Sequence, residues 1–153
     1  MKDSSPEKQL DAFIAKYTPE IGALANTILA KMRARLPGAL ELVYDNYNAL
    51  AIGFAPSERV SDVIFSIALY PRWVSLFFMQ AAGIPDPQKL LKGNGKVARH
   101  IVLNNASDLD SPAIEELILQ ALKCAAKPFG NTSAGRIVIK SISAKQRPRR
   151  PAK

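Results

Sequence analysis

The sequence has little of the chemistry on which many secreted proteins and enzymes depend: one cysteine, one histidine and no long apolar run in 153 residues. A single cysteine, Cys124, excludes an intramolecular disulfide framework. Together with His100 it cannot supply a closed zinc site, because such a site needs four ligands. No stretch approaches the ~18 consecutive apolar residues of a membrane-spanning helix, and the polar N-terminus has no signal-peptide core. We therefore expect a cytoplasmic protein of bacterial type, with no membrane partner.

Groups for nucleophilic or acid–base catalysis are equally scarce. A Ser-His-Asp triad would have to use His100, and the sequence carries no nucleophile-elbow motif. We expect His100 to be structural and Cys124 to be a small buried hydrophobic residue of the last helix. The sequence therefore assigns no catalytic residue and no cofactor, and it favours a binding or accessory protein over an enzyme. Enzymatic function stays open as an alternative, since arginine and lysine alone can stabilise phosphate chemistry.

Negative charge is missing from the C-terminal end of the chain. Residues 1–135 hold 14 basic and 13 acidic side chains, whereas residues 136–153 hold seven basic side chains and no acidic one. We expect one domain over residues 1–142 and a flexible basic tail over residues 143–153, because the tail has almost nothing to bury. The tail side chains able to neutralise phosphates are Lys145, Arg147, Arg149, Arg150 and Lys153. About five such contacts give a slope near −4.5 for the logarithm of the binding constant against the logarithm of salt concentration on duplex DNA. Nucleic-acid binding through the tail is therefore one alternative function, and a solvated tail is the plainer interpretation.

Helix-start signals recur along the chain. A capping side chain stands directly before a proline at Ser5-Pro6, Thr18-Pro19, Asp86-Pro87 and Ser111-Pro112. The cap accepts bonds from unpaired N–H groups, and proline loses nothing at the first helical position. Apolar side chains recur with a helical period over residues 10–17, 21–32 and 114–125. These signals predict three helices and one further turn of helix over residues 87–91.

Strand patterns fill the middle of the chain. The segments ELVYDN, ALAIGFA, DVIFSIALY and WVSLFFM follow one another between residues 41 and 79, and RHIVL and RIVIKSI come later. β-Branched and aromatic residues dominate them, and the gaps between the first four are too short for parallel crossovers. We therefore predict an α+β two-layer sandwich, in which an antiparallel sheet of five to six strands has helices packed on one face.

A glycine-rich stretch, Gly93-Asn94-Gly95-Lys96, suggests a phosphate cradle. A P-loop would need glycine at position 90 and Ser or Thr at position 97, and leucine and valine stand there. The plainer interpretation is a turn, with Gly93 in a left-handed conformation and Gly95 leading into the RHIVL strand. The alternative is an anion site, in which exposed backbone N–H groups are surrounded by the side chains of Lys92, Lys96 and Arg99.

Aromatic residues cluster near the predicted strand ends. Tyr44, Tyr47, Tyr70 and Trp73, with Arg72, are candidates to line one edge of the sheet, with Gly93, Gly95, Lys96 and Arg99 nearby. Aromatic and guanidinium faces suit a planar or phosphorylated ligand. We therefore predict a small anionic ligand as the first candidate partner, against the alternative that these aromatics pack in the core and its rim.

Acidic residues recur at one helical spacing near the N-terminus. Asp3, Glu7 and Asp11 are four residues apart, so they share one face of the first helix. Such a ridge can hold a metal loosely, but acidic residues are also favoured at a helix start by its dipole. We favour a solvated face and assign no metal site.

Several segments carry a family resemblance. PGALELVYDNYNALAIGFAP, SIALYPRWVSLFF, IPDPQKLLKGNGKVARHIVL and LDSPAIEELILQAL together resemble the YdhG-like proteins, a domain of unknown function (number 1801), over about residues 19–127. The resemblance implies an α+β fold and a bacterial cytosolic location, and it brings no established catalytic residues. One member is reported as an iron chaperone functionally similar to frataxin, so iron delivery is a further alternative. A histidine common at the start of the fourth strand is Trp73 here, and no ligand role passes to it.

Overall fold

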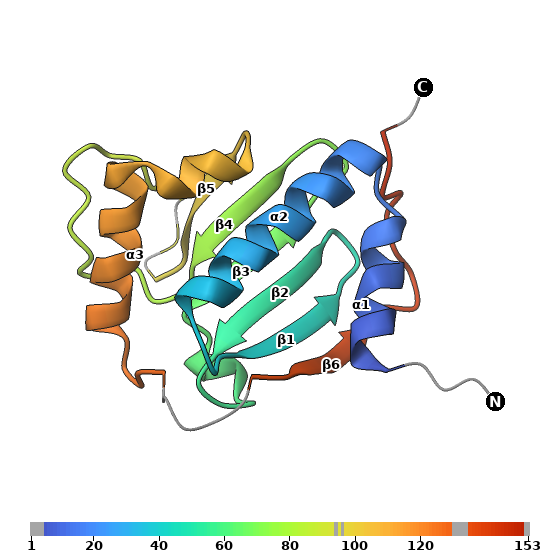
Figure 1. Cartoon of the computed structure of the whole chain (residues 1–153), viewed down its shortest axis with the longest axis horizontal. Coiled ribbons are helices and arrows are strands. Elements are labelled where there is room, and N and C mark those ends of the chain that lie inside the picture. Colours follow the sequence, from blue (N-terminus) through green and yellow to red (C-terminus); the bar gives the residue numbers. More distant parts are fainter. Residues whose placement is uncertain (1–4, 94, 96, 130–134, 152–153) are drawn as a thin grey trace.

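The computed structural model describes residues 5–93, 95, 97–129 and 135–151. The helices are α1 (Pro6–Ala15), α2 (Pro19–Arg35) and α3 (Pro112–Cys124), with short 3-10 turns η1 (Val60–Asp62) and η2 (Ala106–Asp110). The strands are β1 (Leu40–Asp45), β2 (Leu50–Ala55), β3 (Phe65–Leu69), β4 (Val74–Phe78), β5 (Arg99–Leu103) and β6 (Ile137–Ile142). Figure 1 shows α2 running across the front of the sheet, with α3 and α1 at the two sides of the view, and the predicted α+β class is confirmed.

The sheet has the order β5-β4-β3-β2-β1-β6. The first five strands pair antiparallel, as predicted. β6 differs from the expectation of an all-antiparallel sheet, because it runs parallel to β1 and makes the sheet mixed. A hairpin turn fixes the direction of its second strand, whereas β6 returns from α3 through a long connection that leaves the direction free.

One face of the sheet is the core. Val43, Ile52, Ile67, Leu76 and Ile101 lie side by side on five neighbouring strands, and all of them are buried. The buried stripes of the three helices belong to the same hydrophobic cluster. The opposite face is covered by none of these three helices. It carries a smaller buried cluster around Leu42, Ala55 and Val63, and half-buried side chains such as Phe77, which is stacked on His100 at 5.0 Å between ring centroids. His100 is therefore a packing residue, as expected.

Three of the four predicted helix starts are confirmed. The side chains of Ser5, Thr18 and Ser111 accept hydrogen bonds from backbone N–H groups three residues later, at 3.2, 3.3 and 3.4 Å. No helix in the described ranges is long and apolar enough to cross a membrane.

Two local predictions are wrong. Asp86 accepts bonds from the backbone N–H groups of Leu90 and Leu91, both at 2.9 Å, but residues 87–88 form a turn and residues 89–91 are not helical. The helix is interrupted because Lys89 has a φ of 55°, in the left-handed region. Cys124 is exposed instead of buried, because it ends α3 beyond Ala121, the last residue of that helix in the core.

Candidate ligand-binding groove

The antiparallel register separates the residues predicted to share one site. Arg99 pairs with Phe78 at one end of β4, whereas Trp73 precedes Val74 at the other end. Four residue steps of about 3.4 Å put roughly 14 Å between these ends. The prediction that Arg99 and the glycine stretch lie beside Trp73 is therefore wrong, because each residue stands at the opposite end of the same strand pair.

Contacts within the glycine stretch favour the interpretation as a turn. Gly93 has a φ of 113°, and a Cβ on Gly95 would stand 2.8 Å from the carbonyl oxygen of Ala98. The Arg99 Nε donates to the carbonyl oxygen of Gly95 at 2.7 Å, so its guanidinium serves the turn. Lys92 pairs with His100 through two backbone bonds of 2.8 and 2.9 Å. Lys96 lies outside the described residues.

The two tyrosines of the first hairpin do not point to a common site. Tyr44 packs with Leu42 on the helix-free face, where its hydroxyl is buried and has no hydrogen-bond partner among the described residues. Burial raises the pKa of the Tyr44 hydroxyl. Tyr47 lies in the β1–β2 turn with 52% of its surface exposed. Its backbone carbonyl oxygen accepts a hydrogen bond from the backbone N–H of Arg147.

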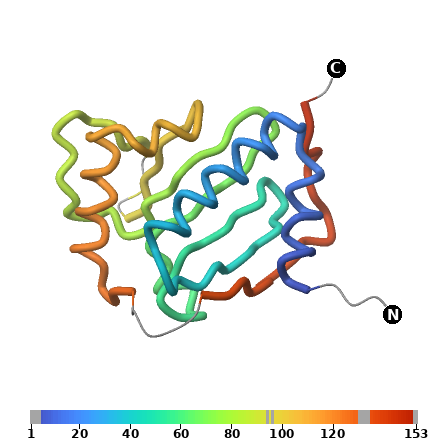
Figure 2. The backbone as a smooth tube through the Cα atoms, viewed as in Figure 1, coloured from blue at the N-terminus to red at the C-terminus, as the bar shows by residue number. Residues whose placement is uncertain are grey.

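Residues 143–151, hereafter the C-terminal strap, pack against the body of the protein. Figure 2 shows this segment leaving β6 and running beside α1 towards the start of α2. The backbone N–H of Ser143 donates to Asp45 at 2.8 Å, and that of Arg147 donates to Tyr47 at 2.9 Å. Lys16 reaches Gln146 of the strap at 3.1 Å. These bonds fix the strap to the β1–β2 turn and to the end of α1.

Arg149 is the anchor of the strap, and only 6% of its surface is exposed. Its Nη2 donates to Asp45 Oδ1 at 2.9 Å and to the carbonyl oxygen of Asn46 at 2.6 Å. The guanidinium also lies 5.7 Å from the centre of the Tyr17 ring. The prediction of a flexible tail with nothing to bury is therefore wrong, because Arg149 pairs with Asp45, a fully buried carboxylate at the end of β1.

Arg150 leaves the strap next to the anchor and reaches the end of α1. Its Nε and Nη2 donate to the carbonyl oxygens of Lys16 and Ala15, at 3.1 and 3.4 Å. These carbonyls are the acceptors that the last turn of a helix leaves without partners. Two of the five N–H donors of Arg150 are used in this way.

The strap and two hairpin turns enclose a groove of about 600 Å³. Turn residues on one side are Asn48, Tyr70, Pro71, Arg72 and Trp73, and strap residues on the other are Arg147, Pro148, Arg150 and Pro151. The turns meet here because the β1–β2 and β3–β4 hairpins close at the same end of the sheet. The structure therefore joins Arg72 and Trp73, from the predicted aromatic cluster, to Arg147 and Arg150, from the predicted tail set.

The groove is lined by both aromatic and cationic side chains. Tyr70 and Trp73 are stacked, with 4.7 Å between ring centroids and 19° between planes, and Trp73 keeps 41% of its surface exposed. Within the described part of the chain, the guanidinium groups of Arg72 and Arg147 have neither a hydrogen-bond nor an ion-pair partner. The lining residues include no carboxylate. Such a surface can stack on a planar ring and bind an anionic group.

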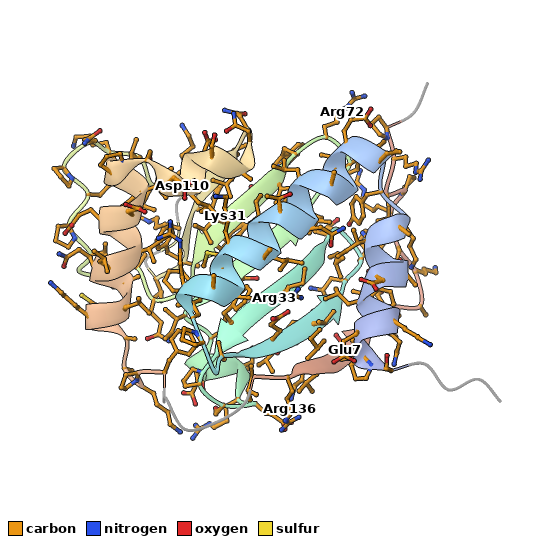
Figure 3. The ribbon with its side chains drawn as sticks, viewed as in Figure 1. Glu7, Lys31, Arg33, Arg72, Asp110 and Arg136 are labelled. Atoms are coloured by element: carbon orange, nitrogen blue, oxygen red, sulfur yellow. The ribbon has the colours of Figure 1, made fainter. Side chains whose placement is uncertain are left out.

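The acidic face of α1 holds no described metal centre. Among the described residues, no group of three or more His, Cys, Asp or Glu could hold a metal ion, and Asp3 lies outside the described ranges. Figure 3 shows Glu7 at the far end of the molecule from Arg72, in the same region as Arg33 and Arg136. The hydrogen bond to Glu41 holds the pKa of Arg33 above its usual value, with Asp11 and Glu7 adding smaller effects. The positive charge of Arg33, which is hydrogen-bonded to Glu41, therefore attracts the negative charges of Asp11 and Glu7 on this face.

Sequence reasoning missed the part that Asn48 and the strap prolines play in the groove. Asp45 was the available signal, because a carboxylate in a strand that is predicted to be buried needs a cationic partner. Comparisons of the chain with protein-family models, with curated proteins and with solved structures found no match. Membership of the YdhG-like family thus stays a prediction from the sequence.

Proposed function

We propose that this protein binds a small anionic ligand that carries a planar ring, of the nucleotide type, in the groove between the strap and the β3–β4 turn. The observation that carries the proposal is the stacked Tyr70–Trp73 pair beside Arg72, Arg147 and Arg150, with no carboxylate among the lining residues. The sequence predicted the same kind of ligand, with Arg99 and Lys96 in place of the strap arginines.

Two physical effects support this class of ligand. The exposed face of Trp73 offers apolar surface to a ring, and guanidinium groups add attraction above aromatic faces. Arg72 and Arg147 are exposed and unpaired in the described structure, so an anion costs them no existing bond. Arginine also matches phosphate geometry with two parallel N–H donors.

The composition of the groove supports a binding role over catalysis. Its lining residues are arginines, prolines, two aromatics and one asparagine. None of these is a histidine, cysteine, aspartate or glutamate, the usual general acids and bases. This lining supports the proposal of a binding or accessory role.

The test uses Trp73, which is the only tryptophan of the chain. A nucleoside 5′-monophosphate, the matching nucleoside and inorganic phosphate are titrated separately while the intrinsic fluorescence is recorded. We expect the monophosphate to bind tightest, since it alone engages both the rings and the arginines.

The matched variants are Arg72→Ala with Arg147→Ala, and Arg59→Ala as control. Arg59 is an exposed arginine before η1, at the opposite end of the sheet. We expect the double variant to bind at least about tenfold more weakly, because charge-assisted hydrogen bonds are lost, and the control to bind normally. If the monophosphate leaves the fluorescence unchanged at millimolar concentration, or if the double variant binds as well as the wild type, the proposal is wrong.

A further inference from the structure

We propose that the groove is the central part of a longer track that binds single-stranded nucleic acid. The inference rests on the proposed function and specifies its ligand class. It starts from two smaller depressions that adjoin the groove, and from the distribution of charge along all three.

The three depressions share lining residues and are therefore neighbours. A depression of about 450 Å³, between α1 and the first half of α2, shares Arg150 with the groove. A depression of about 290 Å³, between α2 and the segment after β5, shares Arg72 and Trp73 with it. Drug-sized ligands fill pockets of roughly 300–1,000 Å³, so the complete track exceeds what one mononucleotide needs.

Helix α2 lies at the middle of this track. Thr18 and Pro19 line the first flanking depression and Glu20 and Ile21 the second, so the two lie on either side of the start of α2. Figure 1 shows that end of α2 beside the strap, and Figure 3 places Arg72 there too. The dipole of a helix makes its N-terminal end favourable for negative charge, and this adds to the field of the three arginines.

The distribution of polar groups matches a chain of nucleotides. All three arginines line the central groove, where they suit phosphates, and Arg150 and Arg72 also border the flanking depressions. Each flanking depression has one carboxylate in addition, Asp11 in one and Glu20 in the other. Two exposed amides, Asn26 and Asn104, line the same two depressions as these carboxylates. Carboxylate and amide groups accept and donate the hydrogen bonds that base edges offer. The track therefore has phosphate-binding chemistry at its centre and base-binding chemistry on both sides.

A single strand fits this surface better than a duplex. Stacking on Trp73 requires a base whose face is free, and the faces of bases in a duplex are covered by their neighbours. A sequence-tolerant single-strand site combines a basic groove with aromatic stacking platforms. The Tyr70–Trp73 pair and the three arginines are these two components.

The test measures binding of 5′-labelled oligothymidylate and oligouridylate by fluorescence anisotropy, over lengths from one to about twelve nucleotides. We expect affinity to rise over the first few nucleotides and then to level off once the track is filled. Three phosphate contacts predict a log–log salt slope of about −2, at 0.7 per contact on single strands. A DNA duplex of equal length is expected to bind more weakly. The comparison of oligothymidylate with oligouridylate shows whether the protein prefers DNA or RNA, and tight binding of either one supports the inference.

Substitutions separate the parts of the site. Trp73→Ala is expected to weaken oligonucleotide binding by about fivefold or more, the loss typical of one stacked base. Arg72→Ala with Arg147→Ala is expected to lower the salt slope by about 1.4, since two phosphate contacts are removed. Arg59→Ala is the control and should change neither value. Melting curves of each variant show whether it is folded, and all substituted side chains are exposed.

Each negative outcome identifies what has failed. If a mononucleotide binds and longer strands bind no tighter, the inference is overturned while the proposed function stands. If neither binds, both are overturned. A duplex, or an acidic peptide of equal charge, that binds as tightly as the single strand also overturns the inference, because the site would then recognise negative charge without the bases.

Discussion

Arg149 and Asp45 form the buried ion pair that holds the strap against the sheet. Lys16 also reaches Asp45, at 3.2 Å, but from a largely exposed position. Removing one partner of a buried pair leaves a desolvated charge, which is far more costly than the net contribution of the intact pair. The position of the groove therefore depends on a residue that does not line it.

The first prediction compares two arginines of the strap. Arg149→Met is expected to lower the free energy of unfolding by roughly 3 kcal/mol, at the low end for a broken buried pair because Lys16 still bonds Asp45. Arg147→Met, two residues earlier and exposed, is expected to change it by less than about 0.5 kcal/mol. Urea denaturation of both variants gives the comparison. Equal effects in the two variants would mean that Arg149 is not an anchor.

The second prediction concerns alkaline pH and Tyr17. The Tyr17 hydroxyl donates to the carbonyl oxygen of Leu69 at 2.9 Å and accepts from the backbone N–H of Leu50 at 3.1 Å. Burial raises the pKa of this hydroxyl above its ordinary value of 10.0, with Arg149 opposing the rise. Because the folded pKa is the higher one, the contribution to stability is complete below pH 10 and is lost as pH rises through the folded pKa.

The matched variant is Tyr17→Phe, which has no hydroxyl to ionise. We expect wild type to be more stable than the variant at neutral pH, and the difference to shrink steadily above about pH 10. Chemical denaturation at a series of pH values measures it. A difference that stays constant to about pH 11.5 would show that Tyr17 ionises equally in the folded and unfolded chain.

At the scale of elements, local sequence signals determine most boundaries. The N-cap and proline pairs predicted the starts of α1, α2 and α3, and the segments rich in β-branched and aromatic residues predicted the positions of β1 to β6. The signals failed where a long-range effect decides. The turn after Asp86 depends on the left-handed Lys89, and the direction of β6 depends on how the chain returns across the sheet.

The third prediction tests a helix start. Thr18→Ala removes the side-chain oxygen that accepts from the Ile21 N–H, and it is expected to lower the free energy of unfolding by about 1 kcal/mol. The control is Thr27→Ala, an exposed threonine inside the same helix, where alanine is the better helix former. Thermal denaturation should therefore show a lower midpoint only for the first variant. An equal fall in both would mean that the cap contributes nothing specific.

At the scale of the whole molecule, the groove depends on contacts between residues far apart in the chain. Sequence analysis named Arg72, Trp73, Arg147 and Arg150 as candidate binding residues, but it placed them in two separate candidate sites. Local patterns carry no information on which turn a C-terminal segment packs against. The sequence also predicted that the glycine stretch lies near the aromatic cluster, whereas the register of β4 and β5 puts the stretch at the opposite end of the sheet.

The central claim is that strap and turn arginines create a positive field around Trp73. Quenching of the single tryptophan by iodide and by caesium measures this field directly, without knowledge of the ligand. Each quenching constant is divided by that of free N-acetyltryptophanamide. At low salt we expect the iodide ratio to exceed the caesium ratio in the wild type and in Arg59→Ala, because the arginines concentrate the anion near Trp73. In the double variant Arg72→Ala with Arg147→Ala, we expect the excess of the iodide ratio to fall. Equal ratios in the wild type, or an excess that survives the double substitution, would contradict the claim.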